Sequence, residues 1–147
     1  MKGATGELRL ALAARIRAAG LRATPSRIHV LWALEQAHTP LSHADVAARL
    51  TALGLDRTTV YRNLVDLADA GILRRSDVDH IWRFERVVEG EKQAAQIHPH
   101  FVCTDCGQVA CLPANAVALR PTRGAPGALK RGNLEIQLRG VCDSCTP

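Results

Sequence analysis

Cys103-Thr104-Asp105-Cys106 and Cys142-Asp143-Ser144-Cys145 are two Cys-x-x-Cys pairs that frame the last third of the chain. Thirty-five residues separate the two pairs, and Gly107 follows the first one, where a zinc knuckle needs a tight backbone turn. Four thiolates brought together by two such pairs form the tetrahedral, soft ligand set that zinc prefers. The spacing therefore predicts a structural zinc ion held by Cys103, Cys106, Cys142 and Cys145.

Disulfides and thiol redox chemistry are the alternatives to a zinc site. Cys111 is a fifth cysteine, so the cysteines cannot all form disulfides within one chain. Secreted disulfide frameworks usually follow a signal peptide, whereas residues 1–6 are polar and start no apolar stretch. A Cys-x-x-Cys pair is also typical of thioredoxin-like sites. A thiol redox enzyme, or a thiol-based redox or peroxide sensor, therefore stays open as an alternative.

The length and hydropathy of the chain limit its class. Its 147 residues are enough for one domain or two small ones. No stretch approaches the roughly 18 apolar residues that a membrane span needs. We therefore expect a soluble, cytoplasmic protein that does not associate with membranes.

The basic charge is concentrated in the first part of the chain. Residues 1–86 contain 13 Lys and Arg against 9 Asp and Glu, whereas residues 87–147 contain 6 against 5. Zinc held by four thiolates would make the second part slightly acidic. A basic N-terminal part favours an anionic partner such as DNA. An arginine-rich, merely solvated surface is the alternative interpretation.

Four helices are predicted in the first 70 residues, and three of them precede residue 55. Apolar residues at helical spacing predict the first over residues 7–19. Thr24 and Pro25 begin the second, in which Trp32 is expected in the core, and residues 38–40 end it. Ser42 and Asp45 resemble a capping box for the third helix, which Gly54 ends.

The fourth helix is predicted from Asp56, its N-cap, to residue 70, with Gly71 after its end. One face is apolar, and the other carries Arg57, Thr58, Tyr61 and Arg62. Strands at residues 72–75 and 80–84, around a turn at residues 77–79, predict a hairpin. Helices followed by a hairpin describe a winged helix-turn-helix, in which Arg74, Arg75 and Arg83 of the wing would contact phosphates.

A second, smaller domain is predicted after a polar hinge at residues 87–97. Strands are expected at residues 101–102, 108–112 and 134–138, so both cysteine pairs would hang from sheet edges. Residues 113–132 contain several prolines and glycines and favour no long element. The predicted fold class is α+β, with a winged helix-turn-helix at residues 1–86 and a small α/β domain with a four-cysteine zinc site at residues 98–147.

Several motifs together resemble the ferric uptake regulator family over nearly the whole chain. They are Leu21-Arg22-Ala23-Thr24-Pro25-Ser26-Arg27, Thr59-Val60-Tyr61-Arg62-Asn63-Leu64, His98-Pro99-His100-Phe101-Val102-Cys103-x-x-Cys106-Gly107 and Gly140-Val141-Cys142-x-x-Cys145. The resemblance implies a metal-responsive transcriptional repressor and not an enzyme. It further implies that the winged helix binds a double-stranded DNA operator and that the C-terminal domain forms a homodimer.

The resemblance also carries site residues onto this chain. Arg22, Tyr61 and Arg62 match DNA-contacting positions, so the expected DNA-binding set is Arg22, Arg57, Thr58, Thr59, Tyr61 and Arg62. A regulatory metal site is implied between the two domains. Its candidate ligands are His80, Glu85, His98, His100 and Cys111.

The ligand types favour zinc as the second metal as well. A His, Cys and Glu set is borderline soft and suits Zn2+ better than Mn2+, while Fe2+ remains open. Within the family, the ligand types therefore favour a sensor similar to the zinc uptake regulators. Each candidate ligand also has an interpretation in which it binds no metal. His80 can be a solvated wing residue, Glu85 can form an ion pair, and Cys111 can be a small buried hydrophobic residue. A DNA-binding protein with structural zinc only, or a zinc-ribbon interaction module joined to a winged helix, also stays open.

Overall fold

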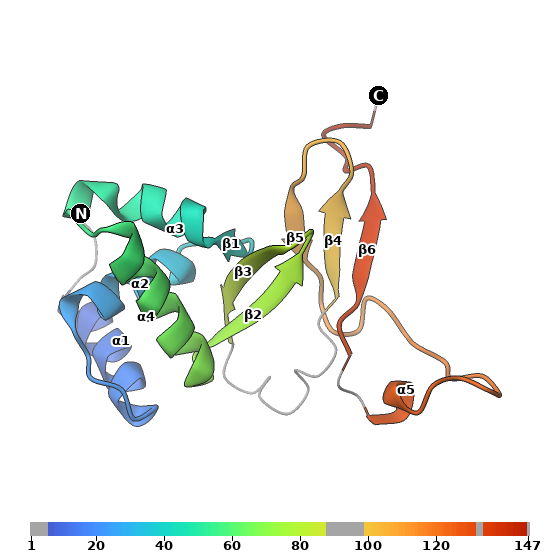
Figure 1. Cartoon of the computed structure of the whole chain (residues 1–147), viewed down its shortest axis with the longest axis horizontal. Coiled ribbons are helices and arrows are strands. Elements are labelled where there is room, and N and C mark those ends of the chain that lie inside the picture. Colours follow the sequence, from blue (N-terminus) through green and yellow to red (C-terminus); the bar gives the residue numbers. More distant parts are fainter. Residues whose placement is uncertain (1–5, 88–98, 132–133, 147) are drawn as a thin grey trace. The chain divides into compact units, whose positions relative to one another are not determined.

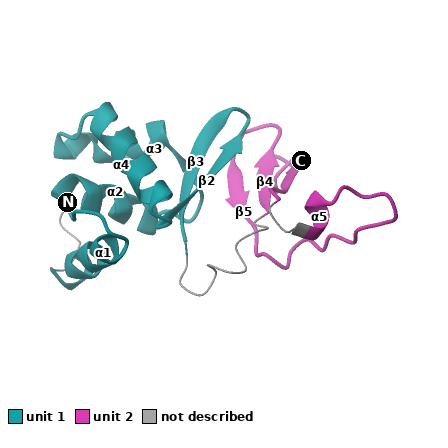
Figure 2. Cartoon of the chain, turned by 60° about the horizontal axis from the view of Figure 1, so that its bottom comes forward, with its two compact units in different colours: residues 1–87 teal, residues 88–147 magenta. Residues whose placement is uncertain are grey.

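Helices dominate the first half of the chain and short strands the second (Figure 1). The computed structural model describes residues 6–87, 99–131 and 134–146. It divides into two units, residues 1–87 and 88–147 (Figure 2). The mixture of helices and strands confirms the predicted α+β fold class. Apart from Val87, the expected hinge lies outside the described residues.

The first unit is built around α2. Its helices are α1 (Gly6–Ala18), α2 (Pro25–Glu35), α3 (His43–Leu50) and α4 (Arg57–Asp69), with a short 3-10 turn, η1 (Thr51–Leu53). α2 packs against α1, α3 and α4, and Leu31 and Leu34 on it are fully buried. Trp32 was predicted in the core. It is only partly buried and packs against the core from outside. None of the described helices has the length and apolar character needed to cross a bilayer.

Side-chain caps determine where three of these helices begin. The Thr24 hydroxyl accepts a hydrogen bond from the Arg27 N–H at 3.3 Å. Ser42 and Asp45 form the predicted reciprocal capping box at the start of α3. Asp56 accepts from the Thr59 N–H at 2.9 Å and caps α4. Each cap satisfies N–H groups that have no partner within the helix, and the predicted caps of α2, α3 and α4 are confirmed.

Three strands complete the first unit in the order β1-β3-β2. They are β1 (Leu41–Ser42), β2 (Leu73–Val78) and β3 (Ile81–Arg86). The hairpin turn lies at Asp79 and His80, which have φ of 53° and 63°. The predicted turn at residues 77–79 was therefore misplaced, and His80 belongs to the turn and not to a strand. Two residues with positive φ suit a two-residue turn between right-twisted strands.

The second unit contains a three-stranded mixed sheet in the order β5-β4-β6. β4 (His100–Cys103) runs antiparallel to β5 (Val109–Cys111) and parallel to β6 (Gln137–Gly140). β4 is therefore the middle strand, and the expectation that both cysteine pairs hang from sheet edges was wrong for the first pair. β6 begins three residues later than predicted. The four-residue α5 (Ala128–Arg131) is the longest helix described in residues 113–131, as expected for that segment.

Candidate metal and DNA-binding sites

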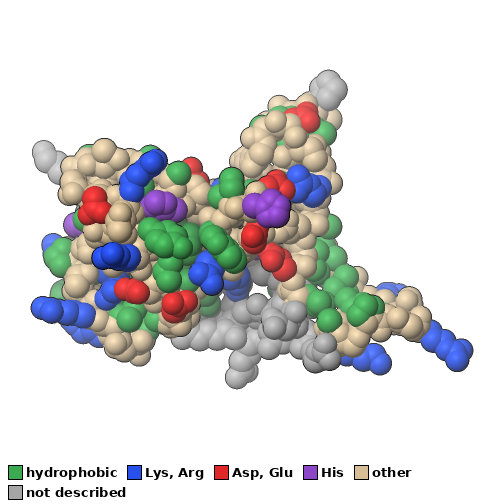
Figure 3. All heavy atoms as spheres, in the orientation of Figure 1, with side chains coloured by type: hydrophobic (Ala, Val, Ile, Leu, Met, Phe, Trp, Pro, Cys, Tyr) green, Lys and Arg blue, Asp and Glu red, His purple; other side chains and the backbone are tan. Residues whose placement is uncertain are grey.

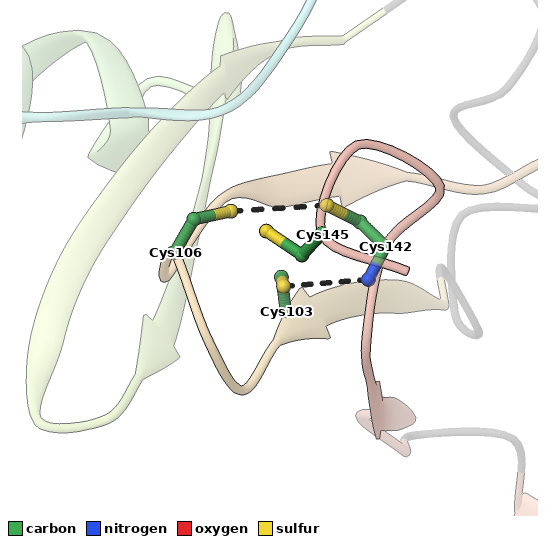
Figure 4. A group of neighbouring side chains, drawn as sticks. All are labelled: Cys103, Cys106, Cys142 and Cys145. Atoms are coloured by element: carbon green, nitrogen blue, oxygen red, sulfur yellow. Dashed lines mark hydrogen bonds between the residues drawn. The ribbon is translucent and has the colours of Figure 1, made fainter. Parts of the chain in front are cut away.

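The four paired cysteines converge in the second unit, and their side chains point toward one another (Figure 4). All four sulfur atoms lie within 4.8 Å of one another. The Sγ atoms of Cys106 and Cys142 are 3.8 Å apart. Two Zn–S bonds of about 2.3 Å at a tetrahedral angle place their sulfurs about 3.8 Å apart. The cluster therefore fits a zinc ion with little rearrangement.

Backbone hydrogen bonds bring the two knuckles together. Cys103 ends β4 and lies opposite Gly140 in the parallel pairing with β6. The Thr104 N–H donates to the Gly140 carbonyl at 2.9 Å, which joins the first knuckle to the end of β6. Gly107, with φ of 71°, donates its N–H to the Cys103 carbonyl at 3.1 Å. The left-handed turn that closes this knuckle suits glycine, as the sequence predicted.

The protonation of these thiols is uneven. Backbone N–H groups of Cys106 and Cys142 lower the pKa of Cys103 to about 6, because they stabilise its thiolate. Hydrogen bonds with the thiols of Cys142 and Cys106 raise the pKa of Cys145 to about 12. The metal-free cluster thus favours one thiolate near neutral pH. Full deprotonation of four adjacent thiols needs a divalent cation, as in structural zinc sites.

The second unit also pairs two of the candidate regulatory ligands. His100 and Cys111 are directly opposite each other on β4 and β5. Their ligand atoms lie within 4.8 Å, and His100 is almost fully buried. One ion can bridge an imidazole and a thiolate at this separation after a small side-chain adjustment. His98, another candidate, lies outside the described residues.

The two candidate ligands in the first unit are far apart. Glu85 is near the end of β3, whereas His80 is exposed in the turn before that strand. Five residues of extended chain span about 17 Å. One metal ion cannot bind both side chains. The Glu85 carboxylate accepts a hydrogen bond from Arg74 at 3.2 Å, so this carboxylate already has a cationic partner in its own unit.

α4 has the two faces that a DNA-reading helix needs. Val60, Leu64 and Leu67 are fully buried against the rest of the unit. Arg57, Thr58, Tyr61 and Arg62 are exposed on the same helix, and Arg22 is exposed just before α2. The Thr59 hydroxyl differs from this set, because it donates to Asp56 at 2.5 Å and takes part in the helix cap.

The arginines of the wing are less available than the sequence suggested. Arg74 pairs with Glu85, and Arg83 lies 3.7 Å from Asp45 at the start of α3. Only Arg75 of the three is exposed, with its guanidinium 4.5 Å from the centre of the Trp82 ring. Acidic and basic side chains also alternate over the helical unit on the face drawn in Figure 3. The surface of α4 therefore offers more free basic groups than the wing.

His43 is a residue of this region that the sequence analysis missed. Its Nε2 donates a hydrogen bond to the Arg57 carbonyl at 2.8 Å. Its ring also meets the Tyr61 ring edge to face, with centroids 5.5 Å apart and planes at 71°. The capping box at Ser42 predicts that residue 43 begins a helix. The contact with α4, however, depends on how α3 and α4 pack, which no local pattern reveals.

Comparisons with known proteins agree with this architecture. The model of the ferric uptake regulator family matches residues 18–123. The ferric uptake regulation protein of Legionella pneumophila is 30% identical over 135 residues, which cover 89% of this chain and 96% of that protein. The crystal structure of the Vibrio cholerae ferric uptake regulator is 28% identical with a TM-score of 0.65, over 88% of this chain and 98% of that one. A zinc uptake regulator complexed with zinc and DNA is 20% identical with a TM-score of 0.62, over 98% and 96% of the two chains, and shows the shared fold.

Proposed function

This chain belongs to the ferric uptake regulator family, whose members are metal-responsive, DNA-binding regulators of transcription, and from that premise we propose that it is a zinc-responsive repressor. Residues 1–86 form its DNA-binding domain, and residues 98–147 form its dimerisation and metal-binding domain. It acts as a homodimer in the cytoplasm and catalyses no reaction. The exposed face of α4, with Arg57, Tyr61 and Arg62, is the observation that carries the DNA-binding part of this proposal.

The DNA contacts follow from that face. α4 enters the major groove, where Tyr61 contributes to base discrimination and Arg62 contacts a phosphate. Arg57 and Thr58 lie one turn earlier and extend the contact along the helix, while Thr59 mainly secures the cap. Arg22 adds a basic group ahead of α2. Of the three wing arginines, Arg75 is exposed and can contact the phosphate backbone of the DNA.

The small core of the second unit supports the proposed dimer. Its described residues bury few apolar side chains, chiefly Val102 and Val109, while Leu138 and Val141 remain exposed. A sheet with so small a core gains stability from a metal and from a partner subunit. Two copies related by a two-fold axis then present two α4 helices to a symmetric operator.

Two zinc ions per subunit complete the proposal. Cys103, Cys106, Cys142 and Cys145 hold the structural ion, which the sulfur distances fit. His98, His100 and Cys111 hold the regulatory ion together with Glu85, an assignment of Glu85 that rests on the sequence resemblance. His80 is the weaker candidate, because it lies too far along the wing from Glu85. The mixed nitrogen, sulfur and oxygen set favours Zn2+ over Fe2+.

The regulatory ion acts through a difference in affinity. It favours the DNA-binding conformation only as far as it binds that conformation more tightly than the other. Couplings of this kind are typically about 1–3 kcal/mol, or roughly 5–150-fold in DNA affinity. Neutral imidazole is required for ligation, so the response fades below about pH 6.

A titration of DNA binding against buffered free zinc tests the regulatory site. The double variant His98→Ala/His100→Ala keeps one tightly bound zinc per subunit, because its four paired cysteines are intact. It loses the zinc-dependent gain in DNA affinity that the unsubstituted protein has. If both proteins respond at the same free zinc concentration, the regulatory site lies elsewhere or does not exist. Parallel titrations with Fe2+ and Mn2+ test the choice of metal.

A thiol-based redox or peroxide sensor is the second candidate, because Cys103 has a lowered pKa and thiolates are the reactive form. Counting reactive thiols before and after removal of zinc separates the two functions. A zinc-held cluster exposes its four thiols only after chelation. The thiols of a redox site react with the thiol reagent before any chelation.

A further inference from the structure

His43 links the two helices of the helix-turn-helix. It is the first residue of α3, and its Nε2 lies 2.8 Å from the carbonyl oxygen of Arg57, the first residue of α4. A carbonyl oxygen can only accept, so Nε2 carries the proton. The hydrogen bond fixes the beginning of α3 against the beginning of α4.

The same imidazole supports Tyr61. The ring centroids are 5.5 Å apart with the planes at 71°, an edge-to-face arrangement that aromatic pairs prefer. Tyr61 is otherwise a surface side chain with 44% of its area exposed. A side chain with that exposure samples several rotamers unless a neighbour restricts it. His43 is such a neighbour, because its ring contacts the Tyr61 ring.

His43 is itself held in place. The hydroxyl of Ser42 accepts from the Asp45 N–H, and the Asp45 carboxylate accepts from the Ser42 N–H at 2.8 Å. This capping box fixes the backbone immediately before His43. The imidazole therefore projects from a rigid helix start and not from a loose loop, which a supporting contact requires.

We propose that His43 is a positioning residue for DNA discrimination, which holds the Tyr61 ring in its reading rotamer. This inference rests on the proposed function, in which α4 reads the operator. An edge-to-face contact biases a rotamer equilibrium by a factor of about 2 to 10. Loss of His43 is therefore expected to lower the ratio of operator to random-DNA affinity by about 2- to 10-fold.

A direct phosphate contact by His43 is the competing explanation, and salt dependence separates the two. A lost phosphate contact weakens binding to all sequences and reduces the slope of log affinity against log salt by about one. Arg62→Ala is the reference for that behaviour. A positioning residue changes the affinity ratio and leaves the slope as it was.

The experiment uses full-length, zinc-loaded protein and an operator that this protein selects from a random-sequence DNA pool. His43→Ala, Tyr61→Ala and the double variant are compared for operator and random DNA across a range of salt. Because His43 acts through Tyr61, the double variant is expected to discriminate no worse than Tyr61→Ala alone. His29→Ala, a histidine change on α2, is the matched control and should retain full discrimination.

A second readout is independent of DNA. Tyr61 is the only tyrosine of the chain, so its ring gives a single, unambiguous set of NMR signals after selective labelling. Those signals should move toward the values of a freely rotating tyrosine in His43→Ala and not in His29→Ala. His43→Gln retains a donor for the Arg57 carbonyl and should recover the helix start without the ring contact.

The outcomes separate the inference from the proposed function. If Tyr61→Ala leaves discrimination unchanged, α4 does not read DNA through Tyr61, and both ideas fail. If Tyr61→Ala lowers discrimination but His43→Ala does not, only the positioning role is overturned. Independent, additive losses in the double variant, or a reduced salt slope in His43→Ala, overturn it as well.

Discussion

At the scale of single residues, Arg74 forms an ion pair with Glu85, whose carboxylate we propose as a metal ligand. The two side chains lie opposite each other on β2 and β3, and both are mostly shielded from solvent. A metal ion that binds Glu85 must compete with this guanidinium. Under the proposed assignment, the Arg74 guanidinium raises the zinc concentration that is needed to fill the regulatory site.

Arg74→Gln should tighten binding of the second zinc ion about fivefold, since an ion pair of this kind contributes about 1 kcal/mol. A competition titration with a chromophoric chelator measures that affinity. Arg75→Gln is the matched control, because it removes the same charge from the next residue, whose guanidinium faces Trp82. Equal effects of both changes would indicate a general charge effect and contradict the specific competition.

Cys103 gives a pH dependence that can be checked without metal. Its pKa is lowered to about 6, so in the reduced, metal-free protein its thiolate is present at neutral pH and is lost as the pH falls through about 6. Since an unfolded cysteine still binds its proton at neutral pH, ionised Cys103 favours the folded state there, and this contribution disappears in acid.

The ultraviolet absorbance of thiolates should therefore rise by about one group per chain around pH 6. Cys103→Ser should remove this step. Cys145→Ser should leave it in place, because the pKa of Cys145 is raised to about 12. A titration in which all thiols ionise together in the usual cysteine range would contradict the assignment.

At the scale of elements, the start of α3 depends on one hydroxyl. Ser42 accepts from the Asp45 N–H, which has no partner inside the helix. Ser42→Ala should lower the free energy of unfolding of the helical unit by about 1 kcal/mol, whereas Ser42→Gly should cost only a few tenths. Urea denaturation followed by helical circular dichroism measures both. Equal losses of unfolding free energy in the two variants would show that the Ser42 cap does not cause the destabilisation.

Elements with local signals could be predicted, and those without could not. Thr24, Ser42 and Asp56 identify helix starts because a cap is a contact between neighbours in sequence. β1 has two residues and pairs with the distant β3, so nothing local indicates it. The turn at Asp79 and His80 was misplaced because neither residue is glycine, although both adopt positive φ.

The candidate sites divide in the same way. The four-cysteine cluster could be predicted because two short-range pairs indicate it. The ion pairs of Arg74 and Arg83 could not, since they join residues brought together by strand pairing and helix packing. The role of His43 was missed for that reason too.

At the scale of the whole molecule, the two units differ in what holds them together. The first unit has a continuous apolar core that includes Ile16, Leu31 and Phe84. In the described part of the second unit, the buried apolar side chains are Val102, Cys103 and Val109. The first unit can therefore rely on hydrophobic burial, whereas we expect the second to depend on the proposed structural zinc ion.

Removal of the structural zinc should unfold the two units unequally. After strong chelation, or in Cys142→Ser, the helical circular dichroism should largely remain, while the NMR signals of residues 99–146 collapse to unfolded values. Sedimentation should show loss of the proposed dimer in the same sample. The matched change Cys111→Ser leaves the four zinc ligands intact and should preserve dimer and fold. Complete loss of helix on chelation would contradict the independence of the first unit.

The parallel pairing of β4 with β6 has a consequence for how this chain can vary. The two strands lead to the two knuckles, and β5 also pairs with β4, so the residues between β5 and β6 form a closed loop and not a spacer of set length. The entropy of closing a loop grows only with the logarithm of its length, so doubling this segment costs about 0.6 kcal/mol. Insertions and deletions can therefore accumulate between β5 and β6 without loss of the zinc ligands. This stretch of the chain is the natural place for lineages to diverge, and for a reporter domain to be inserted.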